Sequence, residues 1–140
     1  MSGLVHEQES PRVGSWRDDV PVAVVAAGGA TAVWVVARAL GAELAVHSGS
    51  GTQEIGLVSV LVTATVVTLA SGGLLRVLAR RTTGAERLWT GVALAALAVS
   101  LAGPAGAVTL SAGLALAAMH LVVGGVVIIG LRRRLDDRVA

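Results

Sequence analysis

The sequence predicts an all-α membrane protein: a bundle of four transmembrane helices in two antiparallel hairpins, with the N and C termini both cytoplasmic. Two observations lead to this fold class. Long apolar blocks occupy residues 20–40, 55–75, 88–102 and 107–131, and a helix of ~20 apolar residues crosses the ~30 Å hydrocarbon core of a bilayer. Nearly all the arginines lie at one set of ends of these blocks.

Composition agrees with this class and divides the chain simply. Of the 140 residues, 54% are hydrophobic and 14% are charged, with a mean hydropathy of +0.78. A water-soluble domain of this size needs a larger polar surface. We therefore expect one transmembrane domain over residues 20–131, a polar N-terminal tail over 1–19 and a basic tail over 132–140. The chain has no cysteine, which excludes disulfides and thiolate chemistry.

The arginines predict the orientation. They precede the first block, fill the segment between the second and third, and follow the fourth, which leaves only Arg38 near the opposite face. Arginine-rich short loops stay cytoplasmic. We therefore predict a multi-pass protein of the cytoplasmic membrane, whose arginine clusters attract anionic lipids. The clusters lack interleaved aromatic residues, so nucleic acid is not an expected partner.

The first block has an alternative interpretation as a cleavable signal peptide, because residues 39–41 resemble a small-x-small cleavage site. However, a 19-residue polar leader precedes a 21-residue apolar run, and signal peptides carry about 7–15 apolar residues. An uncleaved span is therefore favoured.

The connections between the blocks carry turn signals. The outer loop contains Ser-Gly-Ser-Gly at 48–51, which predicts flexibility. The segment 76–87 should extend the second helix, and Thr83 is a candidate N-cap for the third. The Ala-Gly-Pro-Ala-Gly segment at 102–106 predicts a tight turn between the third span, which is short, and the fourth.

Glycine pairs occur at 28–29, 72–73 and 124–125. Small residues drive helix association in lipid because they let backbones approach closely. With the predicted orientation, all three pairs fall in the cytoplasmic half of the membrane. We expect close helix contacts there and a looser outer half, unless the pairs only reflect the glycine-rich composition.

His120 is the main polar candidate inside the membrane. Its helical face also carries small residues, so it should point into the bundle, and Thr31, Thr68 and Ser100 fall at about the same depth. We predict a polar layer in which hydroxyl groups hydrogen-bond a neutral imidazole. A structural bond that fixes register is favoured, and a proton relay or ligand contact is the alternative.

Arg38 is the other candidate. It lies near the outer end of the first span, where Glu43 or Glu54 could form an ion pair with it; an anion-attracting vestibule is the alternative. Trp16 and Trp89 fall at the predicted cytoplasmic boundary, where indole rings favour the headgroup region, so both are predicted interfacial anchors.

The sequence offers little for catalysis. Glu43, His47 and Glu54 are a weak metal-site candidate in a loop without further ligands. No phosphate-binding loop, nucleophile elbow or zinc-protease motif is present in the sequence. We therefore expect no enzyme activity, metal or cofactor.

Several short segments resemble a family of small four-helix actinobacterial integral membrane proteins of unknown function. They are Arg87-Leu88-Trp89, Ser100-Leu101-Ala102-Gly103-Pro104, Met119-His120-Leu121, Trp34-x-x-Ala37-Arg38 and the Gly/Thr-rich outer loop. The resemblance spans residues 20–131. It implies the same four-span topology and adds no activity, cofactor or substrate.

The favoured function is therefore a non-catalytic structural or interaction subunit that packs with itself, as a homo-oligomer, or with a larger membrane partner. The alternative is an oligomeric transporter or channel component that uses the His120 layer. Lost partner association in a His120 variant would favour the first, and a pH-dependent transport phenotype the second.

Overall fold

The computed structural model describes residues 15–136, with side chains up to residue 133. Its elements in chain order are η1 (Trp16–Asp19), α1 (Val20–Ala39), β1 (Ala45–Ser48), β2 (Gly51–Glu54), α2 (Leu57–Arg81), α3 (Ala85–Ser100), η2 (Gly103–Gly106) and α4 (Leu110–Asp136). The predicted tail residues 1–14, and the side chains of the basic tail from residue 134 onward, lie outside the described part of the chain.

Within the described part of the chain, four helical segments are long and apolar enough to cross a membrane, which agrees with the predicted number. The predicted ends differ in part. Arginines extend α2 and α4 beyond their apolar blocks, so these helices contain 25 and 27 residues. The 16-residue α3 is short, as predicted, and the turn and η2 that follow it lengthen the candidate span to Gly106.

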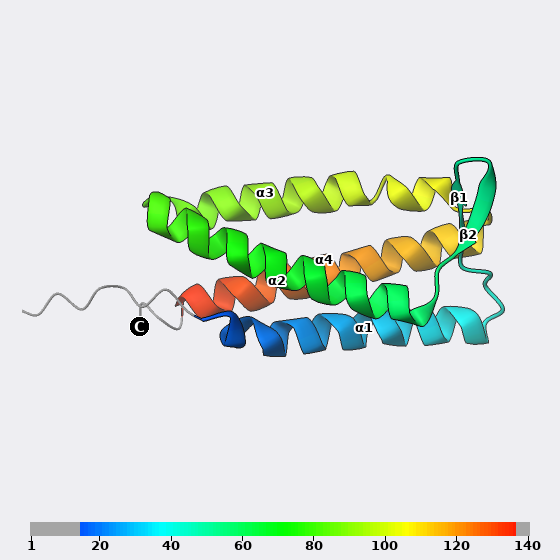
Figure 1. Ribbon diagram of the computed structural model, residues 1–140, viewed down its shortest axis with the longest axis horizontal. Helices are drawn as coiled ribbons and strands as arrows, with labels where there is room; N and C mark the ends of the chain where they lie inside the picture. Colours follow the sequence, from blue (N-terminus) through cyan, green and yellow to red (C-terminus); the bar gives the residue numbers. More distant parts are fainter. Residues whose placement is uncertain (1–14, 137–140) are drawn as a thin grey trace, which may run out of the picture.

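The helices form a bundle in which neighbours in sequence run in opposite directions (Figure 1). α1 packs against α2 and α4, and α3 packs against the same two helices, whereas α2 and α4 touch each other little. α2 and α3 lie close together where the short 82–84 link joins them, and they diverge toward the β-hairpin (Figure 1). We call this V-shaped divergence of α2 and α3 the wedge.

Close contacts form at the glycine pairs, as predicted. A Cβ added at Gly29 would lie 2.6 Å from a Val122 methyl carbon, and one at Gly124 would lie 2.7 Å from Leu97. One member of each glycine pair makes such a contact; the third is Gly72, described below. Gly28 and Gly125 have open space beside them, so these members of their pairs make no close contact within the bundle.

The connection between α1 and α2 and the connection between α3 and α4 form one structure, where only a flexible loop was expected between α1 and α2. β1 and β2 pair as an antiparallel hairpin, with Gly49 at φ +58° in its turn. The N–H of Val108 donates to the carbonyl of Ala45 at 3.1 Å. The hairpin therefore anchors the connection between α3 and α4. Its own two strands are joined by a two-residue turn of small residues, which is typical of tight hairpins.

The link between α2 and α3 also differs from the prediction that Thr83 caps α3. Gly84, not Thr83, is the N-cap of α3, and it makes no side-chain cap bond. The N–H of Gly84 instead bonds the Thr82 hydroxyl at 3.3 Å.

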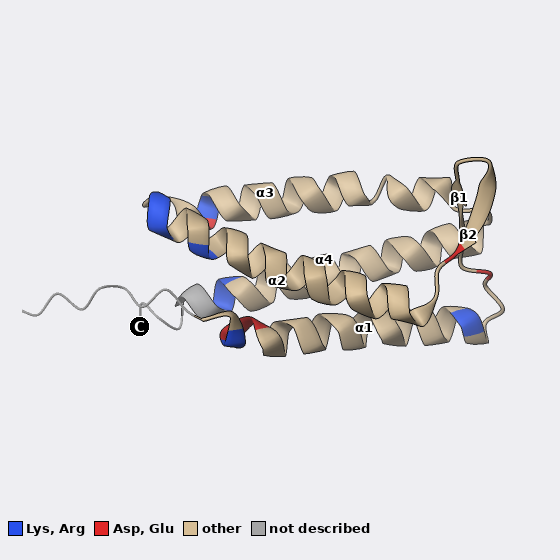
Figure 2. Ribbon diagram, in the orientation of Figure 1, with Lys and Arg blue, Asp and Glu red and all other residues tan. Residues whose placement is uncertain are grey.

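With the exception of Arg38, the arginines of the described residues gather at one end of the bundle (Figure 2). Arg38 lies beside Glu54 of β2, at the end that carries the hairpin. We call these the arginine-rich end and the hairpin end. Arg12 and Arg138 belong to the predicted cluster but lie outside the described residues.

Candidate functional site

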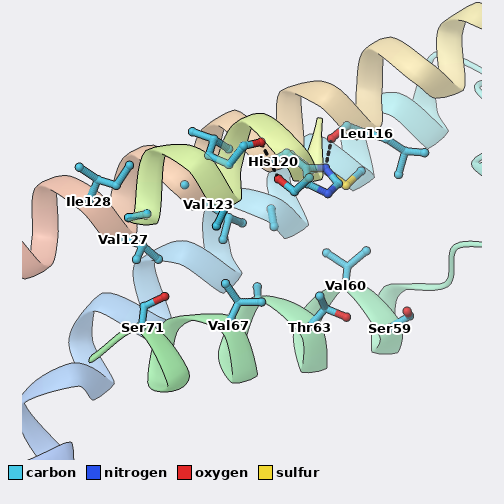
Figure 3. A pocket seen from close by; sticks show the side chains of 18 of the residues that line it. Ser59, Val60, Thr63, Val67, Ser71, Leu116, His120, Val123, Val127 and Ile128 are labelled. Atoms are coloured by element: carbon cyan, nitrogen blue, oxygen red, sulfur yellow. Dashed lines mark hydrogen bonds between the residues drawn. The ribbon is translucent and has the colours of Figure 1, made fainter. Parts of the chain in front are cut away.

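A pocket of about 490 Å³ lies inside the bundle, between α2, α3 and α4, with Ala30 of α1 at its edge (Figure 3). Most of its wall consists of valine, leucine, alanine and other apolar side chains. Its polar side chains are His120 on α4, Ser100 on α3, and Ser59, Thr63 and Ser71 on α2. The wedge between the diverging α2 and α3 creates this space.

His120 forms the polar centre of the α4 wall. Its Nδ1 lies 2.7 Å from the backbone carbonyl oxygen of Leu116, one turn earlier on the same helix (Figure 3). Across the pocket, Thr63 and Val67 on α2 face this wall (Figure 3). The prediction that His120 points into the bundle is therefore confirmed.

The predicted polar layer forms only in part. Ser100 lines the same pocket as His120, but Thr68 and Thr31 do not. The expected bonds from hydroxyl groups to the imidazole are wrong: Thr68 donates to the carbonyl of Ala64 at 2.7 Å and Ser100 to that of Leu97 at 2.8 Å. The Thr31 hydroxyl is buried without a partner among the described residues. Serine and threonine hydroxyls in a helix readily donate to the backbone carbonyl three or four residues earlier. Thr68 and Ser100 form this local bond in place of a bond to His120.

The mouth of the pocket opens sideways. Ser59, Thr63 and Val67 on α2 and Ala96 on α3 line the pocket and are also exposed at the surface of the bundle. In a membrane this surface faces hydrocarbon, so the mouth opens toward the lipid. Ser59 and Thr63, one turn apart on α2, therefore form part of the rim of the pocket.

A buried apolar cluster lies at the arginine-rich end of the bundle. Trp89 is 1% exposed and packs with Val22, Leu75, Val127 and Leu131. Its indole N–H donates to the backbone carbonyl of Ser71 at 3.1 Å. The prediction that Trp89 anchors in the headgroups is therefore wrong, because its side chain faces inward from α3. Trp16, by contrast, is 61% exposed.

A buried ion pair ties the start of α1 to α2, and the sequence prediction missed it. The Asp19 carboxylate accepts a hydrogen bond from the guanidinium of Arg76, and the two side chains are 6% and 23% exposed. The carboxylate lies directly against Gly72, where any Cβ would overlap it. Gly72 and Arg76 lie one turn apart on α2, and this spacing is visible in the sequence. Asp19, the residue that pairs with Arg76, is 57 positions away, so the sequence did not point to it.

At the hairpin end, Arg38 Nη1 lies 3.9 Å from Glu54 Oε1, with both side chains exposed. The Arg38 guanidinium carbon also lies 5.8 Å from the centre of the Trp34 ring. No bond joins Arg38 to Glu43 among the described residues. His47 Nδ1 lies 3.2 Å from the carbonyl oxygen of Gly106, and within residues 15–133 no group of three His, Asp or Glu side chains could hold a metal ion.

These features define the class of the molecule: a small α-helical protein with four segments able to span a membrane and a laterally open pocket. The model of a family of unknown function, DUF6069, matches residues 11–137, and the chain belongs to this family. No curated protein and no solved structure gives a significant match. The matched residues include the whole bundle, and the function of the family is unknown.

Neighbouring glycines allow a test of the buried ion pair. In Gly72→Ala the new methyl group displaces the Asp19 carboxylate from Arg76, so we expect a loss of about 2–4 kcal/mol in the free energy of unfolding. In Gly73→Ala the nearest side-chain atom is 3.9 Å from the new Cβ, so its stability should stay within about 0.5 kcal/mol of the wild type. Unfolding in mixed detergent micelles measures both. Equal stability of the two variants would contradict the role of the pair.

Proposed function

We propose that this protein is a non-catalytic membrane protein that binds a small apolar molecule in the pocket between α2, α3 and α4. The pocket is the observation that carries this proposal. Small-molecule sites are typically concave, roughly 300–1,000 Å³ in volume and mostly apolar, with a few polar groups that orient the ligand. The volume of about 490 Å³ and the five polar side chains meet that description.

The lateral mouth supports entry from the bilayer. An apolar molecule dissolved in lipid reaches Ser59, Thr63 and Ala96 without crossing water, because these exposed residues form the rim. Within the bundle the molecule exchanges lipid contacts for contacts with protein side chains, and the polar groups add hydrogen bonds that hydrocarbon does not offer.

The membrane is the cytoplasmic membrane, with both termini and the link between α2 and α3 on the cytoplasmic side. The arginines at one end support this orientation. They also favour anionic lipids at that face. The hairpin and η2 lie outside the cell.

Association with a second copy or a larger membrane partner is part of the proposal. The outward face of α1 supports it: Gly28 and Ala32 are exposed one turn apart, and a Cβ at Gly28 would meet nothing within 4 Å. Such a face lets a helix of another chain approach closely. In this reading the protein is an accessory subunit that holds its ligand for the partner.

Transport through this bundle is the second candidate, favoured by the position of His120 in the pocket wall. The packing around Trp89 argues against a path through one copy, since this side chain and its neighbours fill the arginine-rich end. An oligomer, or a second conformation that moves Trp89, is needed for transport.

Adjacent alanines on α3 allow a test of ligand binding. Ala96 lines the pocket, whereas Ala95 is exposed and lies outside it. We expect para-octylanisole, an apolar probe, to raise the melting temperature of the purified protein, because a ligand that binds only the folded state at about 100 times its Kd adds about 2.7 kcal/mol of stability. Ala96→Phe should lose this shift and Ala95→Phe should keep it. Equal shifts in the two variants, or none in the wild type, would count against the pocket.

The orientation has a direct test because the chain lacks cysteine. Ser50→Cys in the hairpin turn should react with a membrane-impermeant maleimide on intact cells, and Thr83→Cys should react only after the cells are lysed. The reverse pattern would place the termini outside.

A further inference from the structure

We infer that the pocket selects molecules carrying a neutral O–H group, that is, lipid-soluble alcohols or phenols. The inference rests on the proposed binding function and adds the chemical class of the ligand. It follows from the hydrogen bonds that His120 and Ser100 already donate within their own helices.

The bond at His120 fixes which ring nitrogen carries the proton. A carbonyl oxygen has no proton to give, so the 2.7 Å contact with Leu116 requires Nδ1 to be the donor. In the neutral imidazole the other nitrogen, Nε2, then holds a lone pair and no proton. His120 lines the pocket, and no other hydrogen bond engages its ring among the described residues. Nε2 is therefore an acceptor that lacks a donor.

Ser100 has the same character. Its hydroxyl donates to the carbonyl of Leu97 at 2.8 Å, so its proton is committed within α3 and its oxygen is left to accept. The α3 and α4 walls thus both present acceptors. The α2 wall presents Ser59, Thr63 and Ser71, whose hydroxyls can serve either as donors or as acceptors, so this wall does not set the preference.

The rest of the lining excludes charged ligands. Among the described residues no Asp, Glu, Lys or Arg lines the pocket, so beside a neutral His120 an ammonium or carboxylate would enter without a counter-charge, at a large cost in an apolar site. A neutral hydroxyl group satisfies the bare acceptors, while its apolar body lies along the valines and leucines. A longer tail can leave through the mouth between Thr63 and Ala96.

A pair of probes that differ only in the O–H group tests this selectivity. Para-octylphenol and para-octylanisole share ring and chain, but the second replaces the proton with a methyl group. In calorimetric titrations of the purified wild-type protein we expect the phenol to bind about three- to tenfold more tightly, the contribution of one net hydrogen bond. In His120→Phe the two probes should bind with equal affinity, close to that of the anisole for the wild type. The control His47→Phe, in the hairpin, should keep the wild-type ratio.

A measurement on the unaltered protein guards against a folding defect in the variant. With ¹⁵N-labelled histidine, the Nε2 resonance of His120 should move when the phenol is added and stay in place with the anisole. Binding of both probes with equal affinity and no resonance shift would overturn the selectivity while leaving the pocket intact. Binding of neither probe would overturn the proposed function itself, and the selectivity with it.

Discussion

The close approach of helices at glycine is the constraint on which this structure depends. Lipid gives helices no hydrophobic reason to associate, so van der Waals contact between backbones and small side chains must hold the bundle together. Gly29 seats α1 on Val122 of α4, Gly124 seats α4 on Leu97 of α3, and Gly72 seats the start of α1 on α2. The remaining pair of neighbours, α2 and α3, has no such glycine contact along its length. These two helices diverge toward the hairpin end, and the pocket lies in the space between them and α4.

Two tryptophans explain why the wedge opens toward the hairpin. At the arginine-rich end, Trp89 of α3 donates to the carbonyl of Ser71, which holds this part of α2 against α3. At the hairpin end, Trp34 of α1 donates to the carbonyl of Ile55 at 2.9 Å, just before α2 begins. At the arginine-rich end α2 is therefore held both to α3, by Trp89, and to the start of α1, by the Asp19–Arg76 pair. At the hairpin end the Trp34 bond holds it to α1, so α2 stays with α1 while it diverges from α3. The Trp89 indole is buried, so its bond has no competition from water.

Sequence reasoning succeeded where a single helix decides the answer. Four spans follow from the thickness of a bilayer, and His120 faces inward because its neighbours on the same helical face are small. It failed where two distant segments decide. Trp89 sits at the predicted boundary depth, but its burial depends on α3 facing the cluster around Leu75. The pairing of Asp19 with Arg76 joins residues 57 positions apart, and helical periodicity reveals faces rather than crossing angles. The hairpin formed in a loop whose serines and glycines suggested only flexibility.

The divergence of α2 and α3 is the claim on which the pocket and both proposals rest, and distances between spin labels measure it directly. Val58 and Val99 are exposed near the hairpin end of the two helices, and Val77 and Leu88 are exposed near the arginine-rich end. Electron–electron double resonance on the double-cysteine pairs 58/99 and 77/88, with the protein in lipid nanodiscs, compares the two ends. We expect a clearly longer distance for 58/99 than for 77/88. Equal distances, or a shorter 58/99 distance, would mean that α2 and α3 run parallel in lipid and that the pocket is closed.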